Sequence, residues 1–131
     1  QTLWEKIIAD DFYCINTKHM KDAYEKYLCE GVSLRFAKRN TFIPNIEFKF
    51  PKTEVDAWTI QERVQVMLNH DHFYISPVEL QIPFKLYLGS EKDIEDAEFL
   101  YDVFQEKLDM TLLRDFNRKL KTQHLFQRYI Q

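Results

Sequence analysis

The sequence predicts an α+β protein, with a small mixed or antiparallel sheet in its first half packed against a C-terminal helical bundle. Before residue 76, apolar and polar residues alternate in several short segments, as in half-buried strands. After residue 76, apolar residues recur every three or four positions, as on one face of a helix. At 131 residues we expect a single domain, with a strand-rich part over 1–75 and a helical part over 76–131.

Three segments of the first half are expected to be strands. Residues 11–15 (DFYCI) are short and aromatic, whereas 32–37 (VSLRFA) and 45–50 (NIEFKF) alternate cleanly and should pair antiparallel across a basic turn. Pro51 ends the last of them, because proline donates no ladder hydrogen bond. Between the first two, a helix over 18–29 is expected, followed by Gly31. Its predicted buried stripe comprises Met20, Ala23, Tyr24, Tyr27 and Leu28.

The second half begins with another expected hairpin, 63–68 (RVQVML) and 72–75 (HFYI), whose turn is Asn69-His70-Asp71. Ser76 and Pro77 are expected to open a helix, as N-cap and first residue respectively. Pro83 lies within this helix and should kink it or limit it to short turns.

Two further helices follow. The periodicity is strongest over about 91–108, where a core-facing stripe is expected, and Asp109 is expected to start a last helix. The stripe comprises Ile94, Ala97, Tyr101, Phe104 and Leu108, and the last helix should turn Leu112, Leu113, Phe116 and Leu120 inward.

Composition excludes several classes of site. With only two glycines, the chain has no Gly-rich loop of the Walker or dinucleotide-binding type. Cys14 and Cys29 lack the spacing of a zinc site or a disulfide framework, and are expected to be buried thiols in a reducing cytosol. A net charge of −3 gives no overall attraction to nucleic acid. No apolar segment reaches the roughly 18–20 residues of a membrane span, so no membrane partner is expected.

Residues 84–96 (FKLYLGSEKDIED) place a lysine and an acidic cluster on either side of a helix break. Ser90 and Asp93 resemble a capping box, and the acids suit the positive end of a helix dipole, so ordinary helix punctuation explains much of the pattern. It does not explain Lys85, a charge among apolar residues that needs a partner. If the two helices fold back on each other, Lys85 can reach Asp93 and Asp96. Such a cluster can hold a phosphate and the attached nucleoside.

Residues 63–104 resemble a recurring region of nucleotidyltransferase-fold proteins, in particular the abortive-infection, toxin-type nucleotidyltransferases and their small archaeal relatives. The pattern is a hairpin, an Ile-Ser-Pro-x-Glu helix entry ending here at Glu79, a lysine (Lys85), and a Lys-Asp-x-x-Asp helix start. The last element is Lys92, Asp93 and Asp96. The resemblance implies that Lys85, Lys92, Asp93 and Asp96 bind nucleotide and that Lys85 supports transfer.

The same resemblance implies a magnesium site on the strands. In the family, an Asp-x-Asp motif on one strand and a third acid on a neighbouring strand bind the metal. By this mapping Asp11 and Glu47 are catalytic carboxylates that bind Mg²⁺. The first position of the Asp-x-Asp motif falls on Ala9, and Asp10 is expected to point to the other face of the strand. The family's Gly-Ser motif has no counterpart, so the catalytic fold is expected to be N-terminally incomplete or degenerate. Apart from the resemblance, Asp10 and Asp11 suit a helix junction. Glu47 sits beside Lys49 on the polar face of its strand, where a solvated cross-strand pair would account for both.

Two further patterns are weaker. His70-Asp71-His72 has metal-ligand spacing, but in a turn it is expected to be solvated. Residues 114–129 mix basic and aromatic side chains, either as an RNA-facing surface or as a helix with a basic solvent face and an aromatic core face. These side chains are Arg114, Arg118, Lys119, Lys121 and Arg128 with Phe116, Phe126 and Tyr129.

The leading hypothesis is a cytoplasmic nucleotidyltransferase-like protein that binds a nucleoside triphosphate with Mg²⁺. If active, it would transfer a nucleotidyl group to RNA or protein, as expected of a toxin-antitoxin system. One alternative is a catalytically inactive relative that serves as a binding or assembly module. The other is an RNA-binding domain that uses the C-terminal helix.

Overall fold

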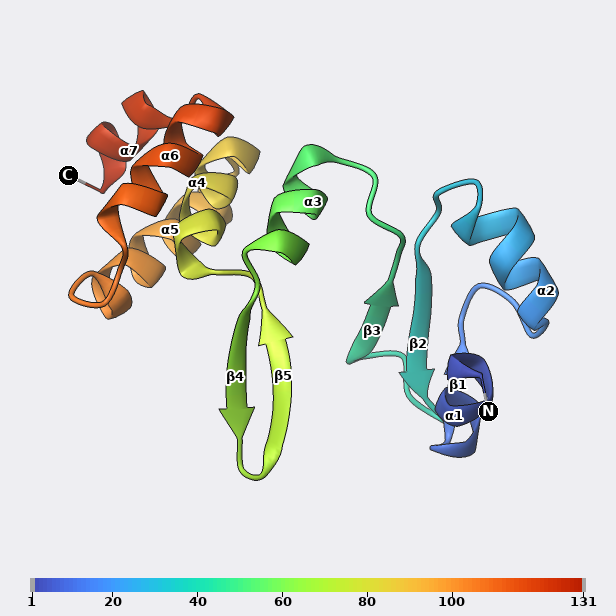
Figure 1. Ribbon diagram of the computed structural model, residues 1–131. Coiled ribbons are helices and arrows are strands. Elements are labelled where there is room, and N and C mark those ends of the chain that lie inside the picture. Colours follow the sequence, from blue (N-terminus) through green and yellow to red (C-terminus); the bar gives the residue numbers. More distant parts are fainter. Residues whose placement is uncertain (1, 131) are drawn as a thin grey trace. The chain divides into compact units, whose positions relative to one another are not determined.

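The computed structural model describes residues 2–130 and divides into two compact units that join between Thr53 and Glu54. Helices dominate, and the strands form one three-stranded and one two-stranded antiparallel sheet, so the protein belongs to the α+β class as the sequence predicts (Figure 1). None of the helices over residues 2–130 is long and apolar enough to cross a membrane.

The first unit contains the three-stranded sheet. Its strands follow the order β1-β2-β3, and β2 pairs antiparallel with both neighbours (Figure 1). The elements are α1 (Leu3–Ala9), β1 (Phe12–Cys14), α2 (Met20–Asp22), the π-helical turn η1 (Ala23–Leu28), β2 (Leu34–Lys38) and β3 (Asn45–Phe48). The predicted strands are therefore confirmed, with the antiparallel pairing expected for the second and third.

The core of the first unit lies on one face of this sheet. Leu34 and Phe36 alternate inward along β2, as the sequence pattern predicts, and pack with Cys14, Ala23 and Leu28. The ring of Trp4, from α1, meets that of Phe36 edge-on at 5.7 Å between centroids. Cys14 is buried as predicted, whereas Cys29 is exposed because it directly follows η1 at the surface.

The helix expected over 18–29 is shorter and wound differently. Residues 23–28 form a π-helix, in which each amide bonds five residues back, as from Cys29 to Tyr24 (2.9 Å). The wider turns move the stripe predicted for an α-helix out of register, so Met20 and Tyr24 are exposed by 50% and 55%. Gly31 follows the helix in the left-handed region (φ 70°), as expected.

The second unit combines the predicted hairpin with a group of helices. Asn69, in the left-handed region (φ 57°), turns the chain between the two strands of the hairpin. The elements are α3 (Glu54–Gln61), β4 (Val64–Leu68), β5 (Asp71–Ile75), α4 (Val78–Leu88), α5 (Glu91–Phe104), α6 (Met110–Leu120) and α7 (Gln123–Tyr129). Helices α4 to α7 enclose a core built on Ile82, Leu86, Ala97, Leu113 and Phe126 (Figure 1).

Two predictions about α4 are wrong in detail. Pro77, not Ser76, is the N-cap, and the Ser76 carbonyl instead accepts a hydrogen bond from Gln81 Nε2 (2.7 Å). Pro83 does not limit the helix to short turns, since α4 runs over eleven residues. Since Pro83 is buried, packing against the core compensates for the hydrogen bond that proline cannot donate.

Candidate functional site

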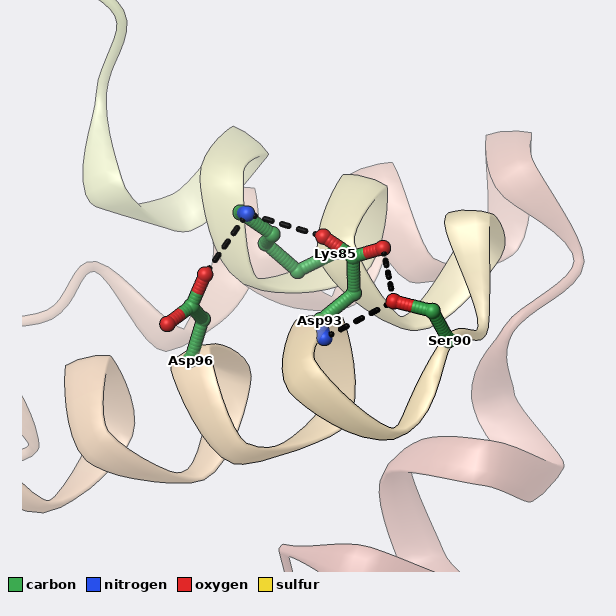
Figure 2. Close-up of polar contacts among 4 residues, drawn as sticks. All are labelled: Lys85, Ser90, Asp93 and Asp96. Atoms are coloured by element: carbon green, nitrogen blue, oxygen red, sulfur yellow. Dashed lines mark hydrogen bonds and ion pairs between the residues drawn. The ribbon is translucent and has the colours of Figure 1, made fainter.

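The candidate site lies where α4 ends and α5 begins. Gly89 closes α4 in the left-handed conformation (φ 71°), and its amide donates to the Lys85 carbonyl. Ser90 then caps α5, because its Oγ accepts a hydrogen bond from the Asp93 amide (3.2 Å). This two-residue turn folds α5 back beside α4 and brings the lysine of one helix to the first turns of the next (Figure 2).

Lys85 bridges the two aspartates of α5. Its Nζ lies 2.9 Å from Asp93 Oδ1 and 2.8 Å from Asp96 Oδ2. The opposite oxygen of Asp93, Oδ2, accepts a hydrogen bond from Ser90 Oγ at 2.6 Å, so the cluster continues into the cap of the helix (Figure 2). The arrangement that the sequence suggested for Lys85, Asp93 and Asp96 is therefore present.

The charges of the cluster stabilise one another. Hydrogen bonds to Asp96 and Asp93 raise the pKa of Lys85. The Ser90 hydroxyl, followed by Lys85, lowers the pKa of Asp93, and the nearby charge of Lys92 acts in the same direction. Lys85 and Asp93 therefore favour their charged forms.

The cluster is open to solvent on one side. The side chain of Asp93 is only 19% exposed, whereas those of Lys85 and Asp96 are 31% and 42% exposed. An ammonium group has three hydrogens to donate, of which two are directed at the aspartates. Lys85 thus has one N–H that is not directed at an aspartate, and both its side chain and that of Asp96 are partly exposed.

Two neighbouring residues of the same pattern have different surroundings. Lys92 is exposed in the first turn of α5, where it adds positive charge beside Asp93. Glu79 does not contact the cluster; its Oε1 accepts a hydrogen bond from the Asp109 amide (2.9 Å) at the start of α6. Glu79 therefore links α4 to α6. The two residues are thirty positions apart, so no local sequence signal could have shown this hydrogen bond.

The predicted magnesium ligands are not brought together. The Asp11 carboxylate accepts from Arg39 Nε (2.9 Å), next to one end of β2. Glu47 lies opposite Arg35, four residues before Arg39 in the chain, and its carboxylate accepts a hydrogen bond from Ser33 Oγ (2.8 Å). Four residues of strand span roughly 13 Å, whereas carboxylates that share an Mg²⁺ both lie about 2 Å from it.

These two residues therefore do not fit a shared Mg²⁺. Asp11 has a positive φ (66°) at the junction that follows α1, in line with the reading of this segment as helix punctuation. Glu47 faces Arg35 on the neighbouring strand, at 4.0 Å between Oε2 and the guanidinium, in line with the alternative of a solvated cross-strand pair.

The two weaker patterns also have clear positions. His70, Asp71 and His72 are exposed at the end of the hairpin, and no group of three metal-ligating side chains occurs within residues 2–130. On the C-terminal helices, Phe116 is fully buried and Phe126 is 7% exposed, so neither ring is available for stacking on RNA. Arg118 and Lys119 pair with Asp115. The alternative of a basic solvent face and an aromatic core face describes this segment.

No family model matches the chain, and neither a curated protein nor a solved structure shows significant similarity to it.

Proposed function

We propose that the protein is nucleotidyltransferase-like and that the Lys85–Asp93–Asp96 cluster binds a nucleoside triphosphate. One observation carries the proposal: a lysine ammonium lies between two aspartates at the start of α5, within hydrogen-bonding distance of both. The sequence pattern that resembles toxin-type nucleotidyltransferases needs these same three residues to meet.

The chemistry of the cluster suits the two ends of a nucleotide. The remaining N–H of Lys85, with Lys92 nearby, offers positive charge to phosphate oxygens. The free oxygen of Asp96 offers an acceptor to ribose hydroxyls or base N–H groups. The intramolecular ion pairs hold both groups in place before a ligand arrives, which lowers the entropy lost on binding.

A second candidate is a catalytically inactive relative that acts as a binding or assembly module. The separation of Asp11 and Glu47 favours it, because a two-carboxylate metal site is the part of the chemistry that this arrangement does not supply. The two candidates differ in one property: the first binds triphosphates at Lys85 and the second does not.

A thermal-shift screen tests the proposal. The whole chain is melted with each of the four ribonucleoside triphosphates, with and without Mg²⁺. At a hundredfold excess over Kd, ligand binding stabilises by about 2.7 kcal/mol, which is a rise of several degrees for a chain of this size. We expect such a rise with at least one triphosphate, and its loss in Lys85→Met and Asp96→Asn.

Lys26→Met is the matched control, because Lys26 also pairs with an aspartate at 2.9 Å, in the first unit. Circular dichroism verifies that each variant is folded. The proposal fails if no triphosphate shifts the transition, or if Lys85→Met and Asp96→Asn respond like the wild type.

A further inference from the structure

Two hollows in the first unit meet at Tyr13 and Arg39. One, of about 470 Å³, extends from these residues along the β2–β3 loop to Phe42. The other, of about 620 Å³, extends past Trp4 to Lys18. Both volumes fall within the roughly 300–1,000 Å³ range of ligand sites. Two smaller hollows, one lined by Leu3 and its neighbours and one by Arg114 and its neighbours, measure about 240 and 220 Å³.

The wall between the two hollows is held in place. The Tyr13 hydroxyl donates to the Thr41 carbonyl at 3.1 Å, which fixes the ring against the β2–β3 loop. Arg39 donates from its backbone amide to the Asp11 carbonyl (2.8 Å) and from Nε to the Asp11 carboxylate (2.9 Å). The two terminal nitrogens of the guanidinium have no ion-pair partner within the described residues and remain available.

The lining combines positive charge with aromatic rings. Its charged members are Arg39 and Lys18, and no carboxylate within residues 2–130 lines either hollow. Lys18 has no ion-pair partner in the described part of the chain. Phe42 is 65% exposed, so one side of its ring is free, and the partly buried Trp4 contributes to the other hollow.

We propose that this double hollow binds single-stranded nucleic acid. Two successive nucleotides would flank Arg39, one in each hollow. Aromatic side chains stack on bases of any sequence, and a basic side chain between two stacking positions meets the phosphate that links them. Bases lie in the two hollows, against Phe42 and Tyr13 on one side and Trp4 on the other. Lys18 approaches the next phosphate. This site is independent of the triphosphate proposed at Lys85.

Fluorescence anisotropy of labelled six-nucleotide single strands, one RNA and one DNA, measures the binding of the whole chain. The variant Arg39→Gln removes the central charge and Phe42→Ser removes an exposed ring. Each has a matched control. Arg35→Gln removes an arginine of β2 that also pairs with a carboxylate, that of Glu47, and that lies outside both hollows. Ile43→Ser removes an apolar side chain next to Phe42 that is 81% exposed but has no ring.

We expect Arg39→Gln and Phe42→Ser each to weaken binding at least fivefold, and Arg35→Gln and Ile43→Ser to stay within twofold of the wild type. Arg39→Gln should also reduce the slope of log K against log salt by about 0.7, the value for one phosphate contact on a single strand. Equal binding of RNA and DNA indicates recognition of bases and phosphates, and preference for RNA adds a sugar contact. The inference is overturned if neither strand binds, or if all four variants bind like the wild type.

Discussion

The ammonium nitrogen of Lys85, near the end of α4, lies 2.9 Å from Asp93 and 2.8 Å from Asp96, near the start of α5. The relationship joins two consecutive helices across a turn of two residues. It gives a charged side chain on a largely apolar helix its partners, and it creates the only feature of the second unit for which we propose a ligand.

Removing the lysine should destabilise the protein. In Lys85→Met the two aspartates lose their shared cation, and we expect the free energy of unfolding to fall by about 1–2 kcal/mol, less than for a fully buried pair because the site is partly exposed. Urea denaturation measures the change. In the double variant Lys85→Met/Asp96→Asn the loss should be smaller than the sum of the single losses, because the two residues interact directly. Additive losses would contradict the ion pair.

Acid should remove part of this stability. Because the Ser90 hydrogen bond and Lys85 lower the pKa of Asp93 in the folded state, ionised Asp93 stabilises the protein above its unfolded pKa of about 3.9. That contribution disappears as the pH falls through the folded pKa. The difference in urea midpoint between wild type and Asp93→Asn should therefore shrink below about pH 4. A difference that stays constant down to pH 2 would show that Asp93 is not stabilised by its ionisation.

High pH should remove the stabilising contribution of Lys85, just as low pH removes that of Asp93. The aspartate hydrogen bonds raise the pKa of Lys85, so its charged form contributes stability below its unfolded pKa of about 10.4. The contribution is lost as the pH rises through the higher folded pKa. Lys85→Arg, which stays charged throughout, should retain its stability at pH 11–12 relative to the wild type. If the wild type and Lys85→Arg lose stability equally at pH 11–12, deprotonation of Lys85 is not the cause of the loss.

The helix cap should contribute separately. Ser90 Oγ accepts a hydrogen bond from the Asp93 amide. Ser90→Ala should cost about 1 kcal/mol of stability, because it leaves this amide in the first turn of α5 without its acceptor. Ser90→Thr keeps the hydroxyl and is the matched control. Denaturation of the two variants side by side measures the cap, and equal stabilities would show that the hydroxyl does not contribute.

A buried polar contact should hold α6 and α7 together. Thr122 is 1% exposed, and its Oγ1 donates to Asn117 Oδ1 at 2.9 Å. Thr122→Val keeps the shape but leaves the Asn117 oxygen without this donor, at an expected cost of about 1–3 kcal/mol. Thr122→Ser retains the donor and should lose less. If valine is tolerated as well as serine, the hydrogen bond is not what stabilises this junction.

Much of the second unit could be predicted from the sequence because its signals are local. Ser90-x-x-Asp93 marked the start of α5, Asp109 marked that of α6, and the polar turn at 69–71 marked the hairpin. The same spacing, Thr53-x-x-Asp56, occurs at the start of α3, a helix that the apolar periodicity does not predict. The break between α6 and α7 has no such mark, since Lys121 rather than glycine adopts the left-handed conformation there (φ 57°).

The metal site failed for a different reason. The resemblance placed Asp11 and Glu47 on neighbouring strands as metal ligands, but the register of β2 between them puts each beside a different arginine. Strand register depends on the geometry of the connecting turns as well as on the hydrophobic pattern, and the resemblance took account of neither. The Lys85 cluster was predictable because its three residues lie within twelve positions on two helices joined by a short turn.

The most direct test of the central claim is nuclear magnetic resonance of the isotope-labelled chain, titrated with the triphosphate that stabilises it most. We predict that the largest shift changes fall on the amides of residues 85–96 and on the Lys85 ammonium signal, and that Lys85→Met abolishes them. Unchanged signals at these residues, or changes confined to the Tyr13–Arg39 hollows, would contradict a nucleotide site at Lys85.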